Sequence, residues 1–247
     1  MQPLKRFFLP LILTLCLVNG ARTQPAKPSV NVDSLINYAS GESKKGNFGE
    51  TAAVAKKLLA YGKGTNDKTA VLYGLIYTAH SLAREVNDSV KYYYKQAHEL
   101  ASELGDYRAL ATVNNALAIY TSEMEMNYLG GGLTYFMKAL HYAEQSPDSH
   151  SYPVILNNIA MAHYLRNDPN GLKYSLEVID IGTVGNDSLL VYSGSFVTAY
   201  MYYLLEDYAT ALGYMESALD AGNLFFLFQE NHRNAAYEIQ RADEKDV

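Results

Sequence analysis

The sequence predicts an all-α protein, a right-handed superhelical solenoid of antiparallel helix pairs. One apolar string recurs three times, as "GLTYFMKAL" at 132–140, "GLKYSLEVI" at 171–179 and "ALGYMESAL" at 211–219. Its apolar residues recur at positions i, i+4 and i+7, the spacing that places them on one face of a helix. No segment alternates apolar and polar residues between hairpin turns, so no sheet is expected.

The first 20 residues, "MQPLKRFFLPLILTLCLVNG", have the pattern of a secretory signal peptide. A basic pair precedes an apolar run that is short for a membrane span, and a small residue, Gly20, ends the segment. We expect cleavage after Gly20, a flexible mature N-terminus at 21–30, and an exported protein that is periplasmic or secreted. Lipidation of Cys16 is not expected, because Leu15 before it fits a lipoprotein site poorly.

Composition excludes several classes of function. The chain has 22 Tyr, no Trp and a single Cys, and its net charge is −6. That cysteine, Cys16, belongs to the leader, so the mature chain has no disulfide, no thiol nucleophile and no cysteine metal site. An acidic chain does not favour nucleic acid as a partner. No later apolar run approaches the roughly 18 residues of a spanning helix, so no stable membrane insertion of the mature chain is expected. The sequence does not specify an oligomeric state.

Each recurring helix follows another helix that has its own pattern. The preceding helix carries a pair of adjacent residues, usually including Ala or Gly, and a larger side chain three residues later. Small residues let two helices approach closely, and the larger side chain fills the space between them. The pairs are Tyr38-Ala39, Tyr73-Gly74, Ala116-Leu117, Ile159-Ala160 and Thr198-Ala199, and the larger side chains are Glu42, Tyr77, Tyr120, His163 and Tyr202.

The chain therefore divides into five helical hairpins over 31–222. A capping helix and a charged tail are expected over 223–247, giving about eleven helices. Asn-Asp-Ser at 186–188 and Asn-Asp-Pro at 167–169 are typical of helix starts, and the glycines at 130–132 predict a loop between helices. The hairpins begin near Val32, Asp67, Leu110, Pro153 and Tyr192.

The fourth hairpin leaves two registers open for its second helix. One register buries Gly171, Ser175 and Val178. The other buries Leu172, Leu176 and Ile179, and we favour it because its side chains are larger.

These units resemble the tetratricopeptide repeat (TPR) family, whose pattern is W-x2-L-G-x2-Y followed by A-x3-F and P over 34 residues. The resemblance rests on "YGLIY" at 73–77 and "GLTYFMKAL" at 132–140. Turn strings support it, since "GNF" at 46–48 and "EDY" at 206–208 stand where the family has Gly-Asp-Tyr. No unit carries the family's Trp.

The resemblance implies a concave groove, lined by the first helices, that binds extended peptides or partner proteins. Carried over by register, the groove residues are Asn115, Asn158, Met161, Phe196 and Tyr200. Asparagine suits a peptide backbone because its amide both donates and accepts hydrogen bonds. The implied function is a non-catalytic protein-binding or peptide-binding scaffold. The alternative is a periplasmic sensor ectodomain of a membrane-spanning signalling or transcriptional regulator.

An enzyme is not expected. The six histidines form no HExxH motif, and no two of them are spaced i, i+4, so neither a zinc site nor another metal or cofactor is predicted. "YSGSF" at 192–196 is not the G-x-S-x-G of a nucleophile elbow. The sequence does not name the ligand.

Overall fold

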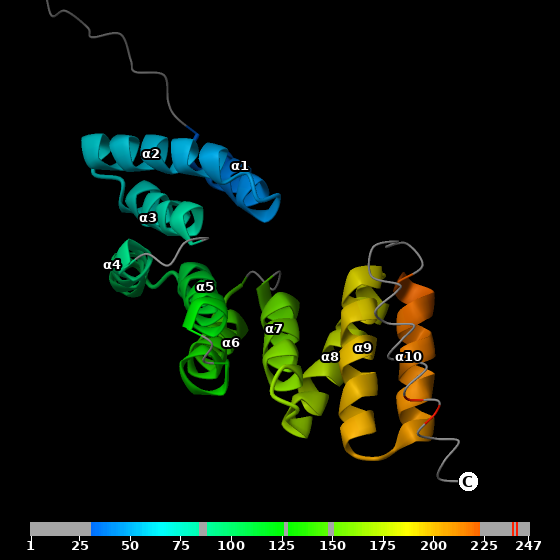
Figure 1. Ribbon diagram of the computed structural model, residues 1–247. Helices are drawn as coiled ribbons and strands as arrows, with labels where there is room; N and C mark the ends of the chain where they lie inside the picture. The colour runs from blue at the N-terminus through cyan, green and yellow to red at the C-terminus, as the bar shows by residue number, and fades with distance from the viewer. Residues whose placement is uncertain are drawn as a thin grey trace, which may run out of the picture. The chain divides into compact units, whose positions relative to one another are not determined.

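The computed structural model describes residues 31–83, 88–125, 128–147 and 151–222, together with residues 239 and 241 (Figure 1). These ranges contain ten α-helices and no strand, which confirms the prediction of an all-α protein. The predicted signal peptide, and all of the predicted capping helix except Ile239 and Arg241, lie outside the described residues. The α-helices are α1 (Val32–Lys44), α2 (Phe48–Thr65), α3 (Lys68–Leu82), α4 (Asp88–Leu104), α5 (Tyr107–Glu125), α6 (Leu133–Gln145), α7 (Tyr152–Tyr164), α8 (Leu172–Gly185), α9 (Ser188–Leu204) and α10 (Tyr208–Gly222).

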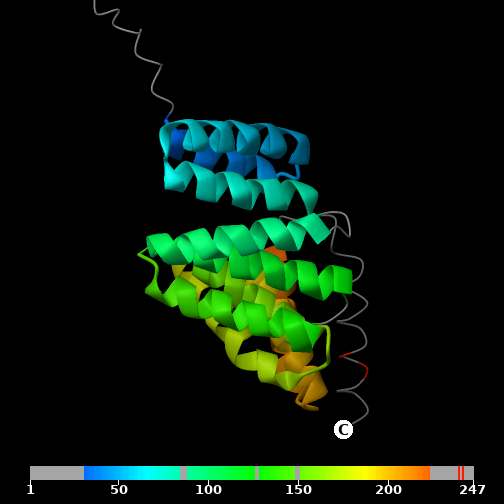
Figure 2. The same cartoon turned by 90° about the vertical axis from the view of Figure 1, so that its left-hand side faces the viewer.

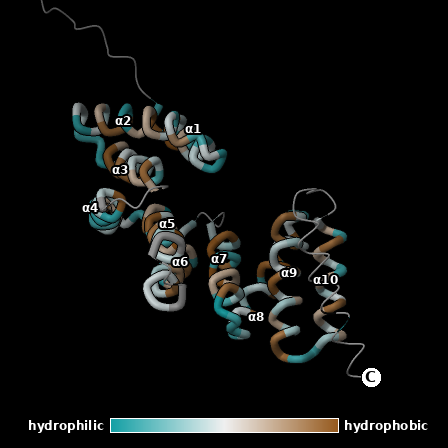
Figure 3. The backbone as a smooth tube through the Cα atoms, viewed as in Figure 1, coloured by the Kyte–Doolittle hydropathy of each residue, from teal (hydrophilic) through white to brown (hydrophobic). Residues whose placement is uncertain are grey.

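Helices that follow one another in the chain pack side by side. Every consecutive pair from α1–α2 to α9–α10 is in contact, and α1–α3 and α7–α9 touch as well. Figures 1 and 2 show this order, from α1 and α2 in blue to α10 in orange. Polar and apolar residues alternate within single helices, as Figure 3 shows. Neighbouring helices can therefore bury their apolar sides against each other. Among the described helices, none combines the length and the apolar character needed to cross a bilayer.

In four of the five hairpins the second helix buries a stripe of residues at i, i+4 and i+7, the same spacing as in the recurring string. Val90, Tyr94 and Ala97 of α4 are each at most 1% exposed, and Phe136 of α6 and Met215 of α10 are buried at the corresponding position. Because these positions recur at i, i+4 and i+7, the helical period alone was enough to locate them.

The favoured register of the fourth hairpin was wrong. In α8 the buried side chains are Ser175 and Val178, whereas Leu172, Leu176 and Ile179 are only half-buried. The reason is the short distance between helices here. A Cβ at Gly171 would lie 2.7 Å from Cβ of His163 and 2.8 Å from Cε of Met201, and the Thr198 hydroxyl donates to Oγ of Ser175 at 2.8 Å. Small residues are needed at this crossing, so the stripe of larger residues is displaced from it.

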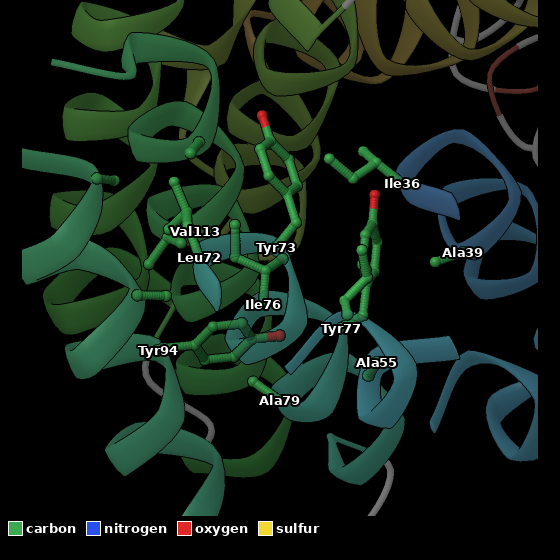
Figure 4. Close-up of a cluster of buried hydrophobic side chains, with 14 of the residues drawn as sticks. Ile36, Ala39, Ala55, Leu72, Tyr73, Ile76, Tyr77, Ala79, Tyr94 and Val113 are labelled. Atoms are coloured by element: carbon green, nitrogen blue, oxygen red, sulfur yellow. The ribbon is translucent and has the colours of Figure 1, made fainter. Parts of the chain in front are cut away.

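The larger side chain of each first helix lies where the pattern placed it. Tyr77, Tyr120, His163 and Glu42 are all buried, and Tyr202 is half-buried. Figure 4 shows Tyr73, Ile76 and Tyr77 of α3 between residues of α1, such as Ile36 and Ala39, and residues of α4 and α5, such as Tyr94 and Val113. These side chains form a core that joins α3 to α4 of its own hairpin and to the hairpins on either side.

A single type of turn joins the helices at six places. One residue takes a positive φ. The N–H of the residue after it donates to a carbonyl five positions earlier in the chain, as Asp187 does to Gly182, at N–O distances of 2.8–3.0 Å. This geometry ends a helix and satisfies its last carbonyls. The following Asp often starts the next helix, as Asp187 does by accepting from the N–H groups of Leu189 and Leu190. The positive-φ residues are Gly46, Asn66, Gly105, Asn167, Asn186 and Glu206.

These turns confirm two predicted helix starts. Asp187 caps α9, and Asp168 caps a short 3-10 turn, Pro169–Gly171, that leads into α8. The prediction of a loop at 130–132 was wrong. Tyr128–Gly132 forms a π-helical turn that continues directly into α6. Extra residues in a helical segment are commonly accommodated as such a turn, which preserves the hydrogen-bonded path.

Candidate functional site

The five predicted groove residues lie on three first helices. Asn115 is in α5, Asn158 and Met161 are in α7, and Phe196 and Tyr200 are in α9. All five side chains are half-buried. They fall into two groups, because Asn115, Asn158 and Met161 line surface hollows, whereas Phe196 and Tyr200 belong to a cluster of aromatic rings.

The two asparagines contact each other. Nδ2 of Asn158 donates to Oδ1 of Asn115 at 3.0 Å, so a hydrogen bond joins α5 to α7 across 43 residues of sequence. An Asn side chain has two N–H donors and a carbonyl oxygen with two lone pairs. The pair therefore keeps further donors and acceptors for a ligand, at positions that the bond holds together.

A larger hollow of ≈ 530 Å³ lies on the N-terminal side of this pair. It is formed by α1 to α5, and Asn115 and Ile119 lie on its wall. The described lining residues include the aromatic side chains of Phe48, Tyr94 and Tyr120, and none of those described residues is Asp, Glu, Lys or Arg. Its lining residues are Ser43, Phe48, His80, Ala83, Tyr94, Thr112, Asn115, Ala116, Ile119 and Tyr120.

His80 is the titratable imidazole of this wall. Burial lowers the pKa of His80 to about 4, so the side chain is neutral at pH 7. Its Nδ1 lies 3.4 Å from Oγ of Ser43, and its ring meets Tyr77 and Tyr94 edge-on, with centroids 5.6 and 5.8 Å away. The imidazole is thus held by neighbours from three helices and adds a neutral polar edge to the wall.

A smaller hollow of ≈ 110 Å³ lies between α5, α6 and α7. Ile119 lines it as well as the larger hollow, so the two are adjacent. Ser122 lines this hollow and is 3% exposed. Its Oγ is buried and has no hydrogen-bond partner in the structure. The lining residues are Ile119, Ser122, Phe136, Asn158, Met161, Ala162 and Leu165.

We call the residues that line these two hollows the neutral groove. The Asn115–Asn158 hydrogen bond joins one hollow to the other. Ile119 and Ser122 were not among the predicted groove residues, although the sequence contains a signal for them. They follow Asn115 at i+4 and i+7 and so share its face of α5.

Phe196 and Tyr200 form an aromatic cluster with Tyr164. The ring of Tyr164 lies edge-on to both, with centroid distances of 5.5 Å to Phe196 and 4.7 Å to Tyr200. The Tyr200 hydroxyl donates to Oδ1 of Asn167 at 2.8 Å. Burial, together with the neighbouring Tyr200, raises the pKa of Tyr164. Tyr200 therefore helps hold the turn after α7 and is engaged within the molecule.

Models of known protein families and curated protein sequences were both compared with this chain, and neither comparison finds a match. Within the ranges that the structure describes, no three His, Cys, Asp or Glu side chains come together in a group that could hold a metal ion.

Proposed function

We propose that this chain is a non-catalytic peptide-binding scaffold. Five TPR-like hairpins following a right-handed superhelical course present the neutral groove to an extended segment of a partner protein. The observation that carries the proposal is the composition of the groove: its described lining residues are apolar, aromatic or neutral polar, and a hydrogen-bonded pair of asparagines lies among them. The signal-peptide pattern of the leader supports export, to the periplasm or beyond the cell.

The chemistry of the groove defines the peptide it fits. Peptide N–H and C=O groups need partners when they are buried, and the amides of Asn115 and Asn158 offer both donors and acceptors. A charged side chain placed against this wall would lose its hydration without gaining an ion pair. The smaller hollow, ≈ 110 Å³, takes one aliphatic side chain beside the hydroxyl of Ser122. We therefore expect an uncharged segment with one aliphatic anchor.

Selection of peptides from a displayed random library tests this proposal. The wild-type protein, without its leader, should enrich sequences that share a short uncharged core with a Leu, Ile or Met. A synthetic peptide carrying that core should bind the Asn115→Ala/Asn158→Ala variant at least about tenfold more weakly, a loss of about 1.4 kcal/mol.

The control variant is Asn157→Ala. Asn157 neighbours Asn158 on α7 and accepts a hydrogen bond from the Ser193 hydroxyl at 2.6 Å, but it lines neither hollow. Its affinity for the peptide should stay within about twofold of wild type, since no groove contact is removed. Selected sequences rich in charge, or a double variant that binds as well as wild type, would refute the proposal.

A further inference from the structure

A second groove lies between α4 and α6, on the second helices of two neighbouring hairpins. It consists of two adjoining hollows of ≈ 420 and ≈ 630 Å³ that share His98 and Lys138. None of its residues lines the neutral groove. We call it the basic groove, because its described lining residues include Lys91, Lys95, His98, Lys138 and His141, and Glu99 is the one carboxylate among those described residues.

The charge of this groove is opposite to that of the whole chain. Three lysines face one glutamate here, although the chain carries a net charge of −6. Lys138 also lies 5.6 Å from the centroid of the Tyr135 ring. Burial lowers the pKa of His98, Lys138 lowers it further, and Glu99 opposes them.

The spacing of the cations follows the helix axes. Lys91, Lys95 and His98 stand at i, i+4 and i+7 on α4, which spreads them over about 10 Å at 1.5 Å per residue. Lys138 and His141 stand at i and i+3 on α6 and form the opposite wall. A row of this length is too long for one phosphate group. It matches about three residues of extended peptide at 3.3 Å each.

The residue types favour carboxylates over phosphate. Arginine, whose planar fork binds phosphate with two hydrogen bonds, is not among the described residues that line the two hollows. Lysine acts as a mobile point charge that can follow carboxylates spaced along a chain. The same hollows are also lined by apolar and aromatic side chains, including Leu117, Leu133 and Tyr142, against which the aliphatic part of a Glu side chain can pack.

We propose that the basic groove docks an acidic peptide segment of a partner protein, with Asp or Glu at nearly consecutive positions. This site differs from the neutral groove in its lining residues and in the charge of its ligand. Either proposal can fail without the other.

Fluorescence anisotropy with a labelled decaglutamate peptide tests this site. The wild-type protein should bind the peptide at low salt, should bind more weakly as salt is added, and should not bind decaglutamine. The Lys95→Gln/Lys138→Gln variant should bind at least about tenfold more weakly, because each substitution removes a cation from one wall.

The matched control is Lys56→Gln/Lys57→Gln, which removes the same charge from exposed positions of α2. At about 0.1 M salt, where the Debye length is about 10 Å, its affinity should stay within about twofold of wild type, since more distant charges are then screened. Equal losses in both double variants would show unspecific attraction and overturn the proposal. So would inorganic phosphate that binds the wild-type protein as tightly as the peptide does.

Discussion

Two glycines at the centres of neighbouring helices should respond to alanine in opposite ways. Gly194 of α9 lies where this helix crosses α8. A Cβ at this position would lie 2.8 Å from Cγ1 of Ile179 and 3.0 Å from the backbone oxygen of Ser175. Gly213 of α10 is exposed, and a Cβ there would meet nothing within 4 Å.

The magnitudes follow from two opposed effects. Alanine in a helix interior is more favourable than glycine by about 0.5–1 kcal/mol, and Gly213→Ala should gain that amount. Gly194→Ala gains the same but overfills the crossing, which costs about 1–3 kcal/mol. One of the close atoms belongs to the backbone and cannot rotate away. Gly194→Ala should therefore lower the free energy of unfolding by about 1–2 kcal/mol.

Urea unfolding followed by circular dichroism at a helix band measures both variants against wild type. A change of 1 kcal/mol should also move Tm by about 2–4 °C in a chain of this size. If Gly194→Ala is as stabilising as Gly213→Ala, the close crossing of α8 and α9 does not exist, and the account of small residues in the fourth hairpin fails with it.

Three further predictions concern a turn, a buried imidazole and the core. Glu206 has a φ of 61° in an exposed turn, whereas the corresponding residue of the other turns is Gly or Asn. Glu206→Gly should therefore raise the free energy of unfolding by about 0.5–1 kcal/mol, and Glu206→Val should lower it. Urea unfolding measures both changes. Because the pKa of His80 falls to about 4 in the folded chain from 6.5, the unfolded chain binds a proton more readily between these values. The stability carried by neutral His80 is thus complete above about pH 6.5 and is lost as pH falls towards 4, by at most about 3 kcal/mol. Between pH 6.5 and pH 4 the free energy of unfolding should fall less in His80→Gln than in wild type. Equal decreases in the two proteins would contradict the proposed role of His80. Phe136→Ala empties a site that is 3% exposed and should cost about 3–5 kcal/mol in the same unfolding assay, and a cost below 1 kcal/mol would contradict the burial.

The sequence was informative wherever the determining forces are local. The buried stripes at Tyr94, Phe136 and Met215 follow from the helical period, and the start of α9 follows from the capping preference of Asp187. The register of α8 could not be predicted in this way. It depends on how closely α7 and α9 approach Gly171 and Ser175, and nothing within α8 itself reveals that distance.

The same limit applies to the candidate site. The register of the repeats placed Asn115 and Asn158 on corresponding faces, but only the fold shows that their amides bond to each other. For the basic groove, the spacing of Lys91, Lys95 and His98 indicates only that they share one face of α4. Lys95 and Lys138 stand on helices that are separated by α5, and they share a groove because neighbouring hairpins stack.

The most direct test of the neutral groove is an NMR titration of protein labelled with ¹³C at the methionine methyl groups. Met161 lines the neutral groove, Met137 lines the basic groove, and Met201 and Met215 are buried. On addition of the peptide selected from the library, the Met161 methyl resonance should shift while that of Met137 stays in place. A shift of Met137 with Met161 unmoved would place the peptide on the second helices and contradict the proposed function.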